Sequence, residues 1–215
     1  MPVEQPQYPV NLVLAGKRCL VVGGGAVALQ KVRGLLDAAA HVHVVATVVS
    51  DPLRALAAEV ATLTLEERPY RAGEVASYWL GIAATDDPLV NRQVHIDGEA
   101  LRVWVNSADD PANCAFTLPS RIRQGPLLVT FSTGGTSPAV ATWLRRRFGA
   151  EFGPEYGTLI RMLADERARV KAEGRSTEGL DWQAALDSGM LDLIREGNLA
   201  EAKERLQACL SSSSG

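Results

Sequence analysis

Residues 18–28 read Arg-Cys-Leu-Val-Val-Gly-Gly-Gly-Ala-Val-Ala, an apolar run that stops at three glycines and continues as a helical pattern. The spacing Gly23-x-Gly25-x-x-Ala28 is a dinucleotide fingerprint in its G-x-G-x-x-A form. Gly23 allows a sharp turn, Gly25 lets a pyrophosphate touch the main chain, and Ala28 lets the helix pack on the strand. The helix start then offers N–H groups and the positive end of its dipole to phosphates. We expect a strand over 18–22, a helix over 26–39, and cofactor contacts from Gly23, Gly24 and Gly25.

Short strands and helices alternate after this fingerprint. Asp51 and Pro52 favour the start of a helix, because Asp is a good N-cap and Pro fits the first turn. The run at 78–84 is continuously apolar, as expected of a strand buried on both faces. Alternation from residue 18 to 105 predicts an α/β fold with a doubly wound, parallel, Rossmann-type sheet. Further strands are expected at 41–45, 61–65 and 102–105, and a further helix at 89–99.

The pattern changes after Asn106. Residues 115–118 and 127–132 are predicted to pair as strands across a loop that holds Gly125-Pro126, and a helix over 138–148 follows with Ser137 as its N-cap. From Pro154 the chain has helical patterns, which glycines divide into about three main pieces. We expect a dinucleotide-binding domain over 1–113, a small strand–helix module over 114–150 and a helical C-terminal domain over 151–215.

Composition excludes several classes of protein. The net charge of −3 argues against a generic nucleic-acid binder, which would be basic. No apolar run reaches the length of a membrane span, and the N-terminal residues lack the pattern of a secretion signal. The three cysteines form neither a metal motif nor a disulfide framework. The three histidines are expected to be structural. We therefore expect a cytoplasmic protein without a metal site and without a membrane partner.

The end of the second expected strand lacks the usual ribose-binding acid. In this architecture an acidic residue follows the glycines by about 20 positions. Here that place reads Val44-Val45-Ala46-Thr47-Val48, with neither a carboxylate nor an arginine. The residues alone therefore leave NAD and NADP open, and contacts from Thr47 and Val48, partly through the backbone, are expected. Thr85 and Asp86 follow another strand and either meet the cofactor or only cap the next helix.

Two later segments carry charge that suggests a substrate site. The turn Asn106-Ser-Ala-Asp-Asp-Pro111 offers a carboxylate as general base, or only an Asx-turn before proline. Residues 111–150 contain five arginines and no Asp or Glu. Together with the helix start at Gly134–Pro138, they favour a polyanionic substrate; the alternative is a solvated helix end at the last three arginines. The arginines are Arg121, Arg123, Arg145, Arg146 and Arg147.

Four segments in order resemble the precorrin-2 dehydrogenase / sirohydrochlorin ferrochelatase family, the N-terminal half of bifunctional siroheme synthases. They are Tyr8-Pro-Val-Asn-Leu, then Cys19-Leu-Val-Val-Gly-Gly-Gly-Ala-Val-Ala with Lys31, then Ala83-Ala-Thr-Asp-Asp with Asn91, and finally Val105-Asn-Ser-Ala-Asp-Asp-Pro through Gly134-Gly-Thr-Ser-Pro. The last segment is the most specific, because a glycine fingerprint alone fits many dehydrogenases. The match covers residues 8 to about 150.

The resemblance implies NAD-dependent oxidation of precorrin-2, a polycarboxylate, to sirohydrochlorin in siroheme or cobalamin biosynthesis. It implies that Asp109 is catalytic and that the middle module joins two subunits in a homodimer. The implied cofactor contacts include Ala26, Val27, Thr47 and Val48. Substrate contacts are expected from Asn106, Arg121, Gly134, Gly135, Thr136 and Ser137.

Other functions remain open from the residues. One alternative is a bifunctional enzyme that also inserts Fe²⁺ into sirohydrochlorin to give siroheme. A second is a non-catalytic NAD-sensing module, which would give no reason for the arginine-rich segment that lacks acids. A third is a dehydrogenase that acts on a smaller acid.

Overall fold

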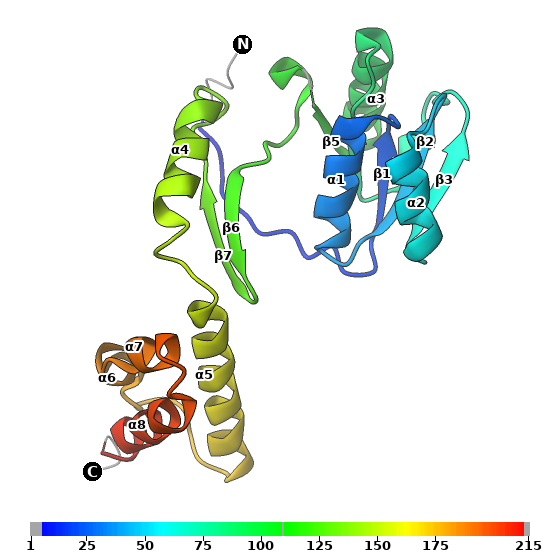
Figure 1. Ribbon diagram of the computed structural model, residues 1–215. Helices are drawn as coiled ribbons and strands as arrows, with labels where there is room; N and C mark the ends of the chain where they lie inside the picture. Colours follow the sequence, from blue (N-terminus) through cyan, green and yellow to red (C-terminus); the bar gives the residue numbers. More distant parts are fainter. Residues whose placement is uncertain (1–5, 109, 213–215) are drawn as a thin grey trace. The chain divides into compact units, whose positions relative to one another are not determined.

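A computed structural model describes residues 6–108 and 110–212, and its elements form two compact units (Figure 1). Unit 1 runs to Leu118 and includes Gly134–Thr136, whereas unit 2 contains Pro119–Thr133 and the chain from Ser137 onward. Each unit has hydrophobic core residues of its own. The three-domain division expected from the sequence stays a prediction.

Unit 1 contains a five-stranded parallel sheet in the order β3-β2-β1-β4-β5. This order confirms the predicted doubly wound fold, and it reverses between β1 and β4, where this architecture binds ligands at the carboxyl ends of the strands. The elements are β1 (Arg18–Val22), α1 (Ala26–Leu36), β2 (His41–Ala46), α2 (Asp51–Glu59), β3 (Leu63–Glu67), the 3₁₀ helix η1 (Glu74–Ser77), β4 (Leu80–Ala83), α3 (Pro88–Leu101), β5 (Trp104–Ser107) and the 3₁₀ helix η2 (Pro111–Asn113).

The central strand β1 is buried on both faces, because helices cover both sides of the sheet (Figure 1). Cys19 and Val21 belong to the core under α1 and α2, whereas Leu20 and Val22 belong to the core under α3. This alternation explains why the strand is apolar at successive positions. Burying each such side chain contributes about 1.5–3 kcal/mol, so β1 fixes the start of the glycine loop that follows it.

Several predicted boundaries in unit 1 are wrong. The first helix ends at Leu36 rather than at residue 39, because the N–H groups of Ala38 and Ala39 bond three residues back and Ala39 takes a left-handed φ of 57°. The strand expected at 102–105 begins at Trp104, because Arg102 ends α3 with a φ of 57°.

The other differences in unit 1 are smaller. Residues 60–63 form a turn, with Leu63 N–H donating to the Val60 carbonyl, so β3 lies two residues later than expected. Ser50, not Asp51, is the N-cap of α2, and Asp51 lies in the first turn. β4 is shorter than the apolar run that predicts it, and α3 extends beyond 89–99 at both ends.

In unit 2 an antiparallel hairpin packs against the helix that follows it. The hairpin joins β6 (Ser120–Gln124) to β7 (Leu127–Phe131) through Gly125 and Pro126, and α4 (Pro138–Phe148) follows with the predicted N-cap Ser137. The strand expected at 115–118 is wrong, because the two-residue turn pairs Gln124 with Leu127 and so sets the register further along the chain. The earlier stretch pairs instead with β5, where Ala115 N–H donates to the Val105 carbonyl.

The remainder of unit 2 is helical, as predicted, but its described residues form four helices rather than about three main pieces. Their core includes Leu159, Ala185, Met190 and Leu206. In the parts of the chain that the structure describes, every helix is too short or too polar to cross a bilayer. The helices are α5 (Glu155–Ala172), α6 (Trp182–Asp187), α7 (Met190–Arg195) and α8 (Leu199–Ser212).

Candidate functional site

The glycine loop is packed against the ends of two strands. Gly23 has a φ of 126°, and a Cβ built on it would lie 2.2 Å from the Ala84 carbonyl oxygen. A Cβ on Gly24 would lie 2.1 Å from the Val48 carbonyl oxygen. Gly23 N–H donates to Val45 O and Ser50 N–H donates to Gly24 O, each at 2.9 Å. The turn from β1 into α1 lies between the segments that follow β2 and β4, and only glycine fits there at both positions.

Gly25 differs, because a Cβ there would meet nothing within 4 Å. It is the N-cap of α1, no side chain caps this helix, and its first turn contains no acidic residue. Gly25, Ala26 and Val27 are exposed, whereas Ala28 is completely buried against the sheet as predicted. The first N–H groups of a helix lack intrahelical acceptors. The start of α1 therefore fits the phosphates of a dinucleotide, which favour such N–H groups and the positive end of the dipole.

The loop between β2 and α2 lies beside the glycine loop. Thr47 and Val48, the predicted cofactor contacts, are exposed. Glu67, which was not predicted as a site residue, reaches this loop from β3. Its Oε1 accepts a hydrogen bond from Val49 N–H at 3.3 Å and one from Arg54. Strand order could have indicated Glu67, because β3 lies next to β2 and both strands end at the same edge.

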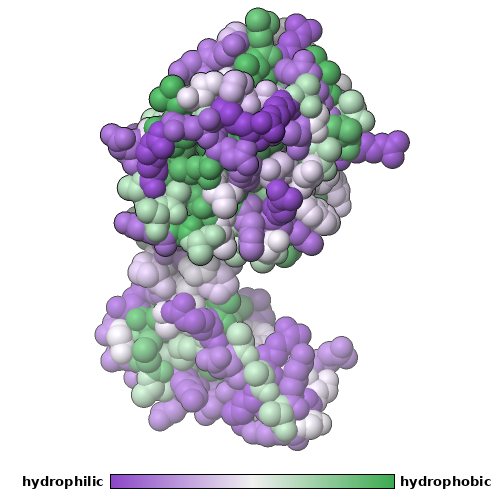
Figure 2. Space-filling view, turned by 90° about the vertical axis from the view of Figure 1, so that its right-hand side faces the viewer, coloured by the Kyte–Doolittle hydropathy of each residue, from purple (hydrophilic) through white to green (hydrophobic). Residues whose placement is uncertain are grey.

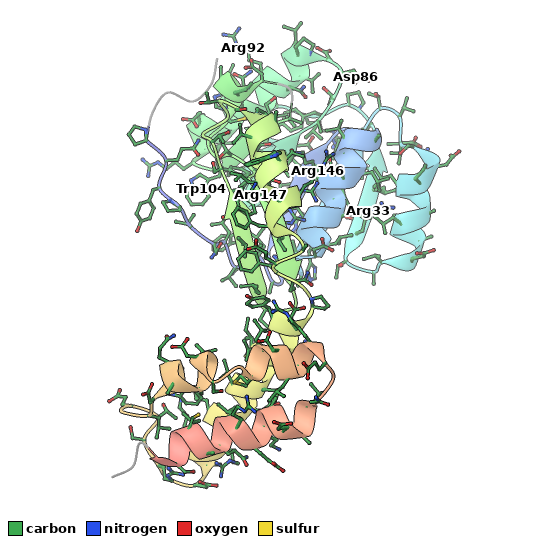
Figure 3. All side chains as sticks on the ribbon, turned by 60° about the vertical axis from the view of Figure 1, so that its left-hand side comes forward. Arg33, Asp86, Arg92, Trp104, Arg146 and Arg147 are labelled. Carbon is green, nitrogen blue, oxygen red and sulfur yellow. The ribbon has the colours of Figure 1, made fainter. Side chains whose placement is uncertain are left out.

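The loop after β4 is fixed by a buried amide. Asn91 Oδ1 accepts from Thr85 N–H at 3.1 Å and from the Thr85 hydroxyl at 2.8 Å, and Asn91 Nδ2 donates to Thr85 O at 2.9 Å. Asp87 caps α3 by accepting from Leu89 N–H at 2.8 Å. Asp86 is exposed on this loop (Figure 3). Thr85 lies next to Ala84, which touches Gly23, so the structure places this predicted contact beside the glycine loop.

The turn after β5 is held by Asn106 and Asp110. Asn106 is buried, and its Nδ2 donates to Phe116 O at 2.9 Å and to Cys114 Sγ at 3.3 Å. Asp110 accepts from Ala112 N–H and from Asn113 Nδ2. The Asx-turn expected here therefore belongs to Asp110. Asp109, the predicted catalytic residue, lies outside the described residues.

The predicted cationic segment lies mostly in unit 2. Arg121 and Arg123 are exposed on β6, and Ile122 between them is buried on the opposite face. Figure 3 shows Arg146 and Arg147 on α4, in the last turn, where cations interact favourably with the helix dipole. The Arg147 guanidinium lies 5.4 Å from the ring centroid of Trp143. Arg121 and Asn106 belong to different units, so their predicted meeting at one substrate stays a prediction.

The Gly134–Ser137 loop needs its glycines. Gly134 and Gly135 have φ values of 62° and 82°, a left-handed pair that other residues rarely adopt. Thr136 is exposed. Ser137 N–H donates to Thr133 Oγ1 at 3.0 Å, and Ser137 Oγ accepts from Val140 N–H at 3.4 Å. The loop thus turns the chain into the start of α4.

Two other chemically reactive side chains, His43 and Cys19, have surroundings that indicate a structural role. The His43 ring hydrogen-bonds to Thr64 Oγ1 at 2.7 Å and stacks on Tyr78, and burial lowers the pKa of His43. Burial raises the pKa of the Cys19 thiol to about 11. Across residues 6–108 and 110–212, no group of three or more His, Cys, Asp or Glu residues is placed to hold a metal ion.

A family model described as "Putative NAD(P)-binding" matches residues 10–120. The siroheme synthase of Nitrosococcus oceani is 37% identical over 207 residues, which cover 95% of this chain and 44% of that protein. The siroheme synthase of Pseudomonas putida (strain W619) is 38% identical over 203 residues, with 93% and 43% covered. The chain thus spans less than half of the length of either relative.

A solved structure gives a match over nearly the whole of both chains. It is described as SirC, precorrin-2 dehydrogenase, and it superposes with a TM-score of 0.76 at 26% sequence identity. The match covers 94% of this chain and 98% of that one. The similarity therefore includes the helical region, where the sequence resemblance is weakest.

Proposed function

The chain belongs to the NAD(P)-binding family whose model matches residues 10–120, and from this premise we propose that it oxidises precorrin-2 to sirohydrochlorin with NAD⁺. The observation that carries the proposal is the uncapped start of α1 behind Gly25, at the edge where the sheet order reverses. Similarity to siroheme synthases and to a precorrin-2 dehydrogenase supports the substrate.

The loops at the carboxyl ends of the parallel strands of unit 1 would hold the cofactor. Gly25, Ala26 and Val27 would face its phosphates, and Thr47 and Val48 would face its adenosine ribose. Thr85 and Asp86, in the loop after β4, would also contact the cofactor. When bound, NAD⁺ supplies the acceptor for a hydride. The protein must then accept the proton that the substrate loses along with that hydride.

We assign that proton to Asp109. Its neighbour Asp110 already accepts hydrogen bonds at both carboxylate oxygens, at 2.9 and 3.0 Å, and so serves the turn rather than the reaction. Ala108 N–H donates to Ala83 O at 2.8 Å, which attaches the residue before Asp109 to the end of β4. A carboxylate at this position can act as a general base.

The substrate is a polycarboxylate, and the arginines of residues 111–150 supply positive charge. Arginine presents a planar fork that matches carboxylates. Arg121 is exposed on β6, and the Gly134–Ser137 loop leads into an exposed helix start. We assign Arg121 and this loop to substrate binding, with Asn106 contributing through the turn that its buried amide holds.

We also propose that the protein is a homodimer. In unit 2, α4 buries Ala141 but exposes Val140 and Trp143, 45% and 55% respectively, at neighbouring positions on its surface. Exposed apolar side chains of this kind on one helix face favour a protein partner.

Conversion of precorrin-2 to sirohydrochlorin in the presence of NAD⁺, followed by absorption spectra, tests the proposal. The Asp109→Asn variant should bind NAD⁺ as the wild type does but lose activity by at least about 100-fold, the usual contribution of a general base. Asp110→Asn is the matched control, because the asparagine oxygen still accepts from Ala112 N–H and the Asn113 amide can reverse so that its oxygen accepts from the new Nδ2. Wild-type turnover by Asp109→Asn would contradict the catalytic assignment, and a wild type without turnover would contradict the function.

A further inference from the structure

The adenosine ribose is the part of the cofactor that distinguishes NAD from NADP, which carries a 2′-phosphate there. In doubly wound folds an acid at the end of the second strand binds the ribose hydroxyl, whereas a nearby arginine accommodates the phosphate. Here β2 ends at Ala46 and is followed by Thr47 and Val48, which have no charge. The end of the second strand therefore favours neither NAD nor NADP.

The structure brings charged side chains to this place from neighbouring elements. Glu67 is the last residue of β3 and pairs in register with Ala46, so the two parallel strands end side by side. Its Oε1 accepts from Val49 N–H at 3.3 Å, which attaches the carboxylate to the β2–α2 loop. Arg54, on α2, donates to the same oxygen.

The surroundings of this pair are those of the predicted cofactor site. The backbone of Val48 and Val49 lies against Gly24 of the glycine loop, and Ser50 N–H donates to Gly24 O. The side chains of Glu67 and Arg54 are 43% and 48% exposed, so a ligand can reach them. Glu67 belongs to β3, the edge strand of the sheet. Figure 2 turns the β3 side of unit 1 toward the viewer, and hydrophilic residues are interspersed with apolar ones on this face.

We infer that Glu67, paired with Arg54, sets a preference for NAD over NADP. This inference rests on the proposed function and deepens it. Glu67 takes the place of the acid that is missing from the end of β2. Arg54, which could otherwise bind a 2′-phosphate, is held by a carboxylate.

The charges explain the direction of the preference. Within the described residues the hydrogen bonds of Glu67 use Oε1, which leaves Oε2 as an acceptor for a ribose hydroxyl. A 2′-phosphate would bring further negative charge to this carboxylate, and like charges repel. Because the pair is half exposed, water and salt weaken the repulsion without removing it.

Isothermal titration calorimetry of the full chain with NAD⁺ and with NADP⁺ tests the assignment. The wild type should bind NAD⁺ more tightly. Glu67→Gln should narrow the ratio of the two dissociation constants by about tenfold, which corresponds to about 1.4 kcal/mol. It should do so mainly by improving NADP⁺ binding, because Arg54 becomes available to the phosphate. Adding Arg54→Gln to Glu67→Gln should reverse that gain.

Glu66→Gln is the matched control. Glu66 precedes Glu67 on β3, has a half-exposed side chain and also pairs with an arginine, Arg68. Successive strand residues point to opposite faces, so Glu66 lies away from the β2–α2 loop. This variant should keep the wild-type ratio.

The outcomes separate this inference from the function on which it rests. If the wild type binds NAD⁺ but Glu67→Gln weakens both dinucleotides equally, Glu67 only supports the loop and the inference is wrong. An unchanged ratio in Glu67→Gln, or a wild type that prefers NADP⁺, also overturns it. If the wild type binds neither dinucleotide, the proposed function fails as well.

Discussion

Gly23 and Gly25 are close in sequence but have different physical reasons to be glycine. A side chain at Gly23 would clash with the β4 end, whereas a side chain at Gly25 would point into open space at the start of α1. Gly25 also has an ordinary φ of −87°, which alanine adopts without strain. Gly23 is therefore required by folding, and Gly25 only by a ligand that approaches the backbone.

Gly25→Ala should leave folding intact and impair cofactor binding. The added methyl group occupies space that the phosphates need, so we expect NAD⁺ affinity to fall by at least about tenfold, or 1.4 kcal/mol. The melting temperature should change little. Calorimetric titration and thermal unfolding measure the two effects.

Gln30→Ala, at an exposed position of α1, is the control and should change neither quantity. Gly23→Ala should instead lower stability, because its Cβ would overlap the Ala84 carbonyl. NAD⁺ binding by Gly25→Ala at wild-type strength would mean that phosphates do not approach this backbone.

Asn91→Asp should destabilise unit 1 at neutral pH. The replacement puts a carboxylate oxygen where Nδ2 now donates to Thr85 O, so two acceptors would face each other in a buried place. We expect a loss of about 1–3 kcal/mol in the free energy of unfolding, the usual penalty for a buried group without its partner. Urea unfolding of the full chain measures it.

The stability of the Asn91→Asp variant should depend on pH in a defined direction. Protonation of the new carboxyl restores a donor toward Thr85 O, so part of the lost stability should be recovered as the pH falls through the pKa of this carboxyl.

The control needs an exposed residue of α3 without a side-chain partner. Gln93→Glu is unsuitable, because Gln93 binds Asp97. Arg92→Gln, exposed beside Asn91 (Figure 3), is suitable and should have little effect. A stability of Asn91→Asp equal to the wild type would contradict the role of this amide.

The glycines were predictable from sequence because their spacing reflects local backbone geometry. Thr85 was predicted as a cofactor contact, but the sequence could not show that Asn91 already binds its N–H, carbonyl and hydroxyl groups. Glu67 could not be found by counting from the glycines, because its place depends on the neighbouring strand. Pairings across elements follow from tertiary structure rather than from local pattern.

At the scale of elements, the strand–helix order was predictable and several boundaries were not. Hydrophobic periodicity identifies a buried strand but does not say where pairing starts. The first strand of the hairpin illustrates this, because the Gly125–Pro126 turn fixes its register at 120–124 rather than at 115–118. Left-handed residues such as Ala39 and Arg102 end elements without a glycine, and so without a sequence signal.

Two helices of unit 2 are joined by a buried carboxylate with a pH-dependent contribution. Glu166 on α5 is 3% exposed, and it accepts hydrogen bonds from Arg169 and, at 3.1 Å, from Gln207 on α8. The Arg169 guanidinium and then Gln207 hold the pKa of Glu166 below its ordinary value of 4.5, although burial opposes them. Its stabilisation is therefore fully present above that value and is lost as the pH falls through the lower, folded pKa.

Glu166→Gln should reduce the acid sensitivity of unfolding. The variant should be less stable than the wild type at pH 7, and the difference should shrink as the pH falls below 4.5 and through the lower pKa of the folded wild-type carboxyl. Urea unfolding of the full chain, followed by helical circular dichroism, gives both values. Glu201→Gln removes an exposed pair with Arg205 and is the control. A difference that stays constant as the pH is lowered from 7 until the protein unfolds would contradict this account.

At the scale of the whole molecule, the chain has separate cores in its two units. Leu20 and Val94 belong to a core of unit 1, whereas Met190 and Leu206 belong to the core of unit 2. The proposed cofactor residues lie in unit 1, and all five arginines of residues 111–150 lie in unit 2. The sequence indicated both groups, but their meeting at one substrate depends on tertiary and quaternary arrangement, which local patterns do not specify.

The proposed dimer gives a test at this scale. Trp143 is 55% exposed on α4 beside Val140, and an aromatic side chain of this size contributes strongly when a partner buries it. Trp143→Ser should therefore shift the protein toward monomer, with a dimer dissociation constant raised by at least about tenfold. Light scattering coupled to size-exclusion chromatography over a range of concentrations measures the shift.

Trp104→Ser is the matched control for this experiment. Trp104 is 50% exposed, at the start of β5 in unit 1 (Figure 3), so its removal deletes a similar apolar surface outside α4. It should leave the molar mass unchanged, because the proposed contact is made by α4. A wild-type protein that is monomeric at all concentrations would contradict the dimer. Dissociation by Trp104→Ser but not by Trp143→Ser would instead place the contact on unit 1.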